Sequence, residues 1–176
     1  MTKIKTEVTI SAAHIVHTTD TPCQRLHGHN WRILVEIEGL IQEDGMIVDF
    51  TEIKGIINQL DHKLLLPSDN MNFILGRENE CITFHIGSKR YMIPRCDVMQ
   101  LPIPVVTAEY MAQLIAEDIY KEMLAGGHAE LKVPQINVSI PNVKVTVYES
   151  EKSYAEHTCH GLGKKINLGD TDGSNK

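Results

Sequence analysis

Three histidines and one cysteine near the N-terminus are residue types that bind divalent metals. The segment Cys23-Gln24-Arg25-Leu26-His27-Gly28-His29 holds two of the imidazoles, and Ala12-Ala13-His14 holds the third. Three histidines are the ligand set of catalytic zinc sites that keep one coordination position open. Such an ion acts as a Lewis acid on a substrate oxygen. We therefore predict that His14, His27 and His29 bind Zn²⁺.

Cys23 has three interpretations that its position alone does not separate. It could be a small buried residue, or a fourth ligand that closes a structural zinc site. It could also be a base, because a thiol beside a dication has a lowered pKa and can abstract a proton. Only the last interpretation makes Cys23 catalytic.

Two segments with alternating polarity must position these histidines. In residues 4–14 and 27–37, apolar side chains recur at every second position, which predicts two strands. His14 continues the apolar face of the first strand, and His27 and His29 continue that of the second. The three imidazoles are therefore expected on buried faces near strand ends.

Asp61-His62 and Glu149 are further candidates for chemistry. Asp61 could orient the His62 imidazole, but adjacent residues do not easily pair in regular structure, so a simple helix end is the favoured interpretation. Glu149 ends an apolar strand and has no evident cationic partner. A buried carboxylate needs one, so Glu149 could bind the N–C–N edge of a guanine-like ring through two hydrogen bonds, or it could turn outward to solvent.

Two more groups have mainly structural interpretations. Thr107-Ala108-Glu109 is typical of a helix start, where an acidic residue is favourable. The sequence His157-Thr158-Cys159-His160 resembles a metal cluster, but it borders a Gly/Asp/Ser-rich tail and is interpreted as incidental.

The remaining elements predict an α+β protein. A helix begins at Asp49 with a capping box, and a second begins at Thr107 and ends at Gly126-Gly127. Strands are predicted at 136–140 and 143–149. Residues 1–160 are interpreted as one domain, with residues 67–104 as an insertion that contains a hairpin (81–86 and 89–93), and residues 161–176 as a flexible tail.

The composition restricts the class of protein. The chain has 176 residues, a net charge of −6 and 5% aromatic residues, a balance that argues against nucleic-acid binding. No apolar run reaches the length of a membrane span, and the N-terminus has no signal-peptide core. Four cysteines without CxxC spacing suit free thiols, so a cytoplasmic location without membrane association is expected.

In order and spacing, the motifs resemble the 6-pyruvoyltetrahydropterin synthase family, which includes the 6-carboxytetrahydropterin synthases of deazaguanine (queuosine and archaeosine) biosynthesis. The resemblance covers about residues 4–66 and 105–154. It rests on six segments: Ala12-Ala13-His14, Cys23-x-x-x-His27-Gly28-His29-Asn30, Gly45–Phe50, Leu60-Asp61-His62-Lys63, Thr107-Ala108-Glu109 and Val147-Tyr148-Glu149-Ser150.

The resemblance implies a tunnelling fold, in which a four-stranded antiparallel sheet carries two helices on one face in ββααββ order. It also implies a homo-oligomer, a trimer or hexamer, with active sites between subunits. His14, His27 and His29 would hold zinc, and Cys23 would be the catalytic base. The resemblance makes Asp61 and His62 its acid–base partners, supplied across a subunit boundary, which would remove the objection that they are adjacent. Glu149 would anchor the pterin ring, and Thr107 and Glu109 would line the same pocket.

The three-residue gap between Cys23 and His27 resembles the carboxytetrahydropterin branch of the family. The implied reaction converts 7,8-dihydroneopterin triphosphate to 6-carboxy-5,6,7,8-tetrahydropterin, acetaldehyde and triphosphate. Zinc would bind and acidify the side-chain hydroxyls, and Cys23 would move the proton. The alternatives are the pyruvoyl-type elimination of triphosphate, and a non-catalytic zinc- or pterin-binding protein.

The chain departs from the family pattern in ways that remove no catalytic group. Residues 67–104 are longer than compact members need and resemble archaeal-type versions with an extra hairpin. Ser150 stands where threonine is frequent, Val106 where proline is usual, and Leu65-Leu66 where Leu-Asn is common. The insertion makes the rim of the pocket, and with it the specificity for the substrate side chain, the least predictable part.

Overall fold

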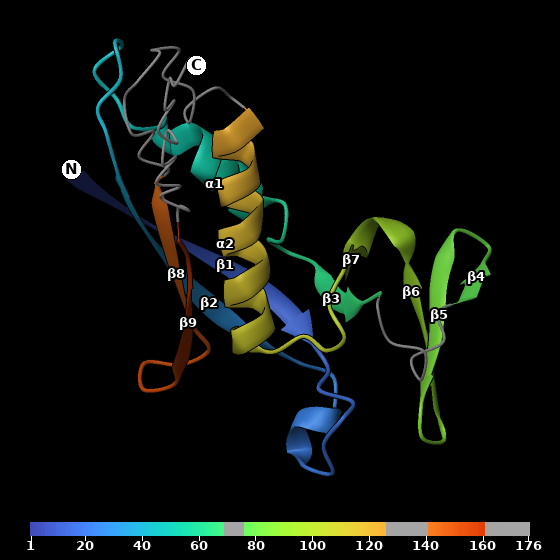
Figure 1. Ribbon diagram of the computed structural model, residues 1–176. Helices are drawn as coiled ribbons and strands as arrows, with labels where there is room; N and C mark the ends of the chain where they lie inside the picture. Colours follow the sequence, from blue (N-terminus) through green and yellow to red (C-terminus); the bar gives the residue numbers. More distant parts are fainter. Residues whose placement is uncertain (69–75, 126–140, 161–176) are drawn as a thin grey trace, which may run out of the picture.

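One mixed sheet of six strands forms the body of the protein in the computed structural model, which describes residues 1–68, 76–125 and 141–160. Both helices lie on the same face of this sheet (Figure 1). The strand order is β7-β3-β1-β2-β8-β9. The strands are β1 (Thr2–His14), β2 (His27–Gly39), β3 (Leu64–Pro67), β7 (Val98–Leu101), β8 (Asn142–Tyr148) and β9 (Tyr154–Cys159).

The long antiparallel pair of β1 and β2 is the centre of the sheet. Each strand has 13 residues, and the register places His14 directly opposite His27 and Ala12 opposite His29. Burial alternates along both strands as the sequence predicts, with Ile10 and Trp31 buried and Ser11 and Asn30 exposed. The histidines therefore lie on the helix-covered face, at the end of the strand pair.

Two helices cover this face. α1 (Phe50–Asn58) is capped by Asp49, whose side chain accepts a hydrogen bond from the Thr51 N–H at 2.7 Å, as the sequence predicts. α2 (Ala108–Ala125) begins after Thr107, whose carbonyl accepts from the Met111 N–H at 3.0 Å. The buried face of α2 packs on β8 and β9. Its predicted stop at residues 126 and 127 lies outside the described part of the chain.

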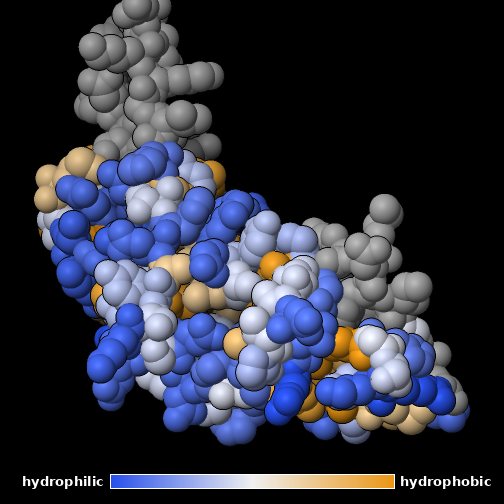
Figure 2. Space-filling model, turned by 90° about the horizontal axis from the view of Figure 1, so that it is seen from below, coloured by the Kyte–Doolittle hydropathy of each residue, from blue (hydrophilic) through white to orange (hydrophobic). Residues whose placement is uncertain are grey.

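The 67–104 segment adds strands beside this body. A three-stranded sheet of β4 (Gly76–Glu78), β5 (Cys81–Ile86) and β6 (Lys89–Pro94) is followed by the short 3-10 helix η2 (Arg95–Asp97) and β7. The β5–β6 hairpin confirms the prediction, and its turn uses Gly87 at φ 58°. A second apolar cluster joins Ile82, Phe84 and Ile86 of β5 to Ile15 and Leu64. In Figure 2, apolar surface gathers over this side of the molecule.

The sheet differs from the prediction at both edges. β3 and β7 pair in parallel beyond β1, so the sheet is mixed rather than purely antiparallel. Beyond β8 the neighbouring strand is β9, which the sequence analysis did not predict, while the predicted strand at 136–140 lies outside the described residues. The predicted strand 143–149 corresponds to β8. The two helices and the antiparallel order β1-β2-β8-β9 confirm the α+β class.

Two observations bear on the chain's surroundings. All four cysteines are free, as their spacing predicts. Within the three described stretches, no helix is long and apolar enough to cross a lipid bilayer.

Candidate metal centre and adjoining pocket

Four side chains converge at the end of the β1–β2 pair. The side chains of His14, His27, His29 and Glu149 each offer one ligand atom, and these four atoms lie within 4.8 Å of one another. The register explains the meeting, because β2 pairs with β8 at Arg32 and Tyr148, so Glu149 follows near His29. The structure thus brings the three predicted zinc ligands together and adds a carboxylate.

Backbone carbonyls orient two of the imidazoles. Nδ1 of His14 lies 2.8 Å from the Val106 carbonyl oxygen, and Nδ1 of His27 lies 2.7 Å from that of Arg25. A carbonyl only accepts, so in each ring Nδ1 carries the proton and Nε2 keeps its lone pair. The two Nε2 atoms then face each other at 3.0 Å. Two lone pairs at this distance repel unless a cation lies between them.

Burial favours the neutral form of two of the imidazoles, and an imidazole must be neutral to bind a metal. The His14 side chain is completely buried. Its burial lowers its pKa to about 4, against the opposing effect of the Val106 hydrogen bond. Burial also lowers the pKa of His29, although the nearby Glu149 carboxylate opposes this. Near neutral pH these rings therefore offer lone pairs rather than charges.

An unsatisfied nitrogen shows that the residues fit a metal. Nε2 of His29 is buried and makes no hydrogen bond. An oxygen of Glu149 lies 3.2 Å from it, within ion-pair distance but without hydrogen-bond geometry. The same oxygen is 3.7 Å from Nε2 of His14. Ligands bound at about 2.0–2.1 Å to one tetrahedral zinc lie roughly 3.3 Å apart, a spacing close to those observed.

Trp31 forms the floor under the imidazoles. Its ring is completely buried and stands edge-on to His14 and His29, at centroid distances of 4.9 and 5.0 Å. The indole N–H donates to the Ala12 carbonyl at 3.1 Å, so its one polar group is satisfied inside the core. The rings are therefore held by packing as well as by hydrogen bonds.

Five of the predicted residues lie outside this cluster, and three of them are Cys23, Thr107 and Glu109. Cys23 is exposed on the 3-10 helix η1 (Pro22–Gln24), in the loop that joins the ends of β1 and β2. Thr107 precedes α2, one residue after the Val106 carbonyl that holds His14, and Glu109 is exposed in the first turn. Glu149, rather than Cys23, supplies the fourth donor of the cluster.

Asp61 and His62 pair with each other, which corrects our objection that adjacent residues do not. Nδ1 of His62 lies 2.9 Å from Oδ2 of Asp61. His62 has φ 55°, a left-handed conformation that brings the two neighbouring side chains together. The other oxygen of Asp61 accepts from the Ser11 N–H at 2.8 Å, and this bond is the main reason that the pKa of Asp61 is lowered. The pair is a carboxylate–imidazole dyad.

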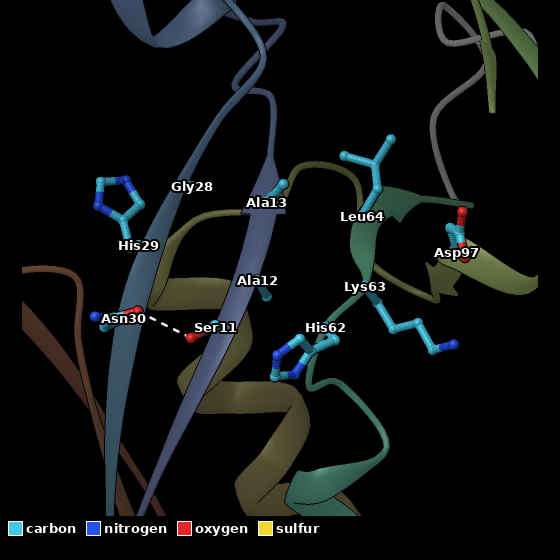
Figure 3. Close-up of a pocket in the computed structure, with 10 residues that line it drawn as sticks. All are labelled: Ser11, Ala12, Ala13, Gly28, His29, Asn30, His62, Lys63, Leu64 and Asp97. Atoms are coloured by element: carbon cyan, nitrogen blue, oxygen red, sulfur yellow. Dashed lines mark hydrogen bonds between the residues drawn. The ribbon is translucent and has the colours of Figure 1, made fainter.

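A pocket of about 570 Å³ opens beside this dyad (Figure 3). Ser11 and Asn30 project from the face of β1 and β2 that the helices do not cover, and Ser11 Oγ donates to Asn30 Oδ1 at 2.9 Å. His62, Lys63 and Asp97 lie on the β3 side of β1. The other lining residues are Ala12, Ala13, Gly28, His29 and Leu64. His29 thus belongs both to the lining of the pocket and, through its ring, to the metal cluster.

Comparison with known proteins decides the family. The chain matches the family described as 6-pyruvoyl tetrahydropterin synthase over residues 3–159, a span that includes both the cluster and the dyad. The chain belongs to this family. It is therefore related to tetrahydropterin synthases, as the motifs predict.

Two relatives of the family are named for the carboxy reaction. A Haemophilus influenzae protein named 6-carboxy-5,6,7,8-tetrahydropterin synthase is 36% identical over 105 residues, which cover 53% of this chain and 71% of the relative. A Pyrococcus horikoshii protein, provisionally named for the same activity, is 33% identical over 139 residues, which cover 79% of this chain and 78% of the relative.

Solved structures of the family confirm the fold. A catalytic-residue variant of Plasmodium vivax 6-pyruvoyltetrahydropterin synthase superposes with a TM-score of 0.71 at 26% identity, covering 90% of this chain and 98% of that one. A second P. vivax variant gives a TM-score of 0.70 at 25% identity with the same coverage. The tunnelling fold expected from the motifs is thereby confirmed.

The structure adds residues to the site that the motifs did not reveal. The Val106 and Arg25 carbonyls that orient the imidazoles carry no side-chain signal and are invisible in a sequence. Trp31 had a signal, because it lies two residues after His29 on the same face of β2. The place of Asp97 in the pocket lining depends on how its segment folds back beside β3, which no local pattern shows.

Proposed function

We propose that this protein is a zinc-dependent 6-carboxytetrahydropterin synthase acting on 7,8-dihydroneopterin triphosphate. The observation that carries this proposal is the convergence of three imidazole Nε2 atoms on one point in a chain of this family. The three-residue gap between Cys23 and His27 and the names of the two relatives favour the carboxy reaction over the pyruvoyl one.

Each of the chain's groups has a role in this proposal. His14, His27 and His29 hold the zinc ion, which when bound acts as a Lewis acid on a side-chain oxygen of the substrate. Cys23, which is exposed in the loop between β1 and β2, acts as a thiolate and takes the proton from the substrate. Thr107 and Glu109 line the substrate pocket from the start of α2.

Glu149 binds the pterin ring in this proposal. Its side chain is about one-third exposed (34%), so one carboxylate edge can accept two hydrogen bonds from an N–C–N edge. The same carboxylate contacts His29, so the substrate and the metal cluster would meet at this residue. An exposed carboxylate can leave the cluster when substrate enters, which would keep one metal position open.

Asp61 and His62 act as the complementary acid–base pair, and we propose that a second copy of the chain supplies them. His62 lines a pocket with Ser11 and Asn30, whose side chains lie on the face of the sheet away from the helices, whereas the three proposed zinc ligands lie on the helix side. A single chain therefore holds the dyad and the cluster on opposite faces. A homo-oligomer, trimeric or hexameric, would let one subunit's dyad serve its neighbour's metal.

Product analysis tests the reaction. Zinc-loaded protein is incubated with 7,8-dihydroneopterin triphosphate, and acetaldehyde and the mass of the pterin are measured. Acetaldehyde together with a carboxylated pterin is the expected result. A pyruvoyl product without acetaldehyde would replace the carboxy reaction with the family's other one, and no turnover at all would favour a binding protein.

Cys23→Ala separates the base from a structural ligand. Because Cys23 is outside the four-residue cluster, the variant should keep its zinc and its folded state and lose turnover by about 10²–10⁴-fold, the usual contribution of a general base. Cys81→Ala removes a free thiol that belongs to neither the cluster nor the pocket lining, and it is the control. Loss of zinc from the Cys23 variant would instead assign it to a closed structural site.

A further inference from the structure

The 67–104 segment contributes a residue to the pocket beside the Asp61–His62 dyad. Most of the lining comes from β1, β2 and the residues before β3, but Asp97 belongs to η2, at the far end of that segment. The segment therefore does more than extend the sheet, because it completes one wall of the pocket.

Lys63 connects this wall to the body of the protein. Its ammonium group donates to the carbonyl of Cys96, the residue before Asp97. An ammonium has three N–H donors, and this bond uses one of them. Among the described residues no carboxylate pairs with Lys63, so its charge and two of its donors remain available.

The bond to Cys96 also fixes where the charge lies. A free lysine side chain loses up to about 2 kcal/mol of rotamer entropy when it is held in one place. Since the hydrogen bond already holds Lys63 at the rim, a ligand that binds there loses less of that entropy. Pre-positioning of this kind strengthens binding without adding a contact.

A second donor faces the same space. Asn30 uses its carbonyl oxygen to accept from Ser11, which leaves its two amide N–H donors for a ligand. His62 lies beside them with its side chain 82% exposed. An ammonium, an amide and an imidazole around one open pocket suit an anionic group with several acceptor oxygens, such as a phosphate.

We propose that this pocket binds the phosphate-bearing end of the substrate through Lys63, which the 67–104 segment holds in position through Cys96. The inference deepens the proposed function and rests on it for the identity of the ligand, a pterin triphosphate. Because the pocket opens on the face away from the metal cluster, the two ends of one substrate contact different copies of the chain.

Asp97 limits what the pocket accepts. Its carboxylate forms no ion pair within the described ranges, and its one hydrogen bond is from the Cys96 thiol at 3.4 Å. A negative charge on the same wall weakens the binding of a bare polyphosphate. A ligand that also carries hydroxyl donors can bond to that carboxylate, so Asp97 favours a phosphorylated polyol over an inorganic phosphate.

Tripolyphosphate binding tests this proposal without any need for turnover. Zinc-loaded protein is titrated with inorganic tripolyphosphate in a calorimeter. Lys63→Met should weaken binding roughly ten- to hundredfold, the usual effect of losing one charged hydrogen bond. Lys63→Arg keeps the charge and should retain most of the affinity. Lys54→Met, on the exposed surface of α1, removes an equal charge elsewhere and should change little.

Removing the charge of the neighbouring Asp97 should change the tripolyphosphate affinity in the opposite direction. Asp97→Asn should tighten tripolyphosphate binding several-fold, because it removes a like charge, while it raises the KM for the pterin substrate. Lys63→Met should raise the same KM and change kcat much less. If Lys63 only held the 67–104 segment in place, Lys63→Met would lower the melting temperature and leave tripolyphosphate binding unchanged.

The outcomes keep this inference separate from the proposed reaction. The phosphate pocket is overturned if wild-type protein does not bind tripolyphosphate. It is also overturned if Lys63→Met binds tripolyphosphate within about twofold of wild type. Both conclusions hold whatever product the enzyme makes. Conversely, weaker tripolyphosphate binding by Lys63→Met supports the pocket even if acetaldehyde is never released.

Discussion

Histidines lie in opposite environments on the two sides of the β1–β2 pair. On the helix-covered face, the His14 ring is completely buried, is fixed by a backbone carbonyl and has a pKa lowered to about 4. On the open face, His62 is 82% exposed and is paired with a carboxylate. The same type of side chain is a buried ring with an available lone pair in one region and a water-accessible group beside an acid in the other.

In the proposed function, this difference separates two kinds of chemistry. Metal binding needs lone pairs without protons, and burial provides them by penalising the charged imidazole. Proton transfer and anion binding need groups that exchange with water, and the open face provides these. Since strand residues alternate between faces, one-residue steps from Ser11 to Ala12 and from His29 to Asn30 cross from one environment to the other.

Removing one imidazole of the cluster should have the largest effect. We expect His27→Ala to weaken zinc binding by more than about a hundredfold, because losing only an outer partner of a ligand already costs about 10–100-fold. A competitive chelator titration measures the affinity, and circular dichroism checks the fold.

His62→Ala is the matched variant on the open face. It should keep the zinc affinity of the wild type and lose turnover, because its ring is outside the cluster. Equal loss of zinc from both variants would show that the two faces do not divide the chemistry in this way.

Local patterns predicted the parts of the molecule that depend on neighbours in the sequence. Alternation placed His14, His27 and His29 on the helix-covered face, the Asp49 cap fixed the start of α1, and the Gly87 turn fixed the β5–β6 hairpin. Each of these features is encoded within a few residues of where it acts.

Features set by long-range packing escaped prediction. β9 mixes Glu156 and His157 with small residues, so it has no clear apolar periodicity, and its pairing with β8 makes it a strand. β3 is a run of only four residues that a strand or a helix could use. The left-handed turn at His62, which creates the dyad, has no decisive local signal, because histidine tolerates that conformation better than most residues but rarely needs it.

Glu149 is partly exposed and contacts the buried metal cluster. A variant at this position therefore tests whether metal binding and substrate binding can be separated. We expect Glu149→Gln to keep zinc binding within about tenfold of wild type, since three imidazoles remain, and to raise the KM for the pterin substrate roughly ten- to hundredfold through loss of a charged hydrogen bond. Chelator competition and steady-state kinetics measure the two effects.

Glu151→Gln is the control for this change, because Glu151 is exposed in the following turn. Its zinc affinity and KM should match those of the wild type. If Glu149→Gln lost zinc as completely as His27→Ala, the carboxylate would be a required ligand and the site would be closed.

The smallest effect concerns the stability that Asp61 provides on the open face. Hydrogen bonding to the Ser11 N–H lowers the pKa of Asp61, so the folded state holds the carboxylate in its ionised form more strongly than the unfolded chain does. The resulting stability is present above the unfolded pKa of about 3.9 and is lost as pH falls through the folded pKa. Wild type should therefore melt slightly higher than Asp61→Asn near pH 6, and the difference should shrink below about pH 4. Thermal melts of both proteins across this range measure it. A difference that stayed constant with pH would mean that the Asp61 charge does not stabilise the open face, and that the dyad is held by the turn at His62 alone.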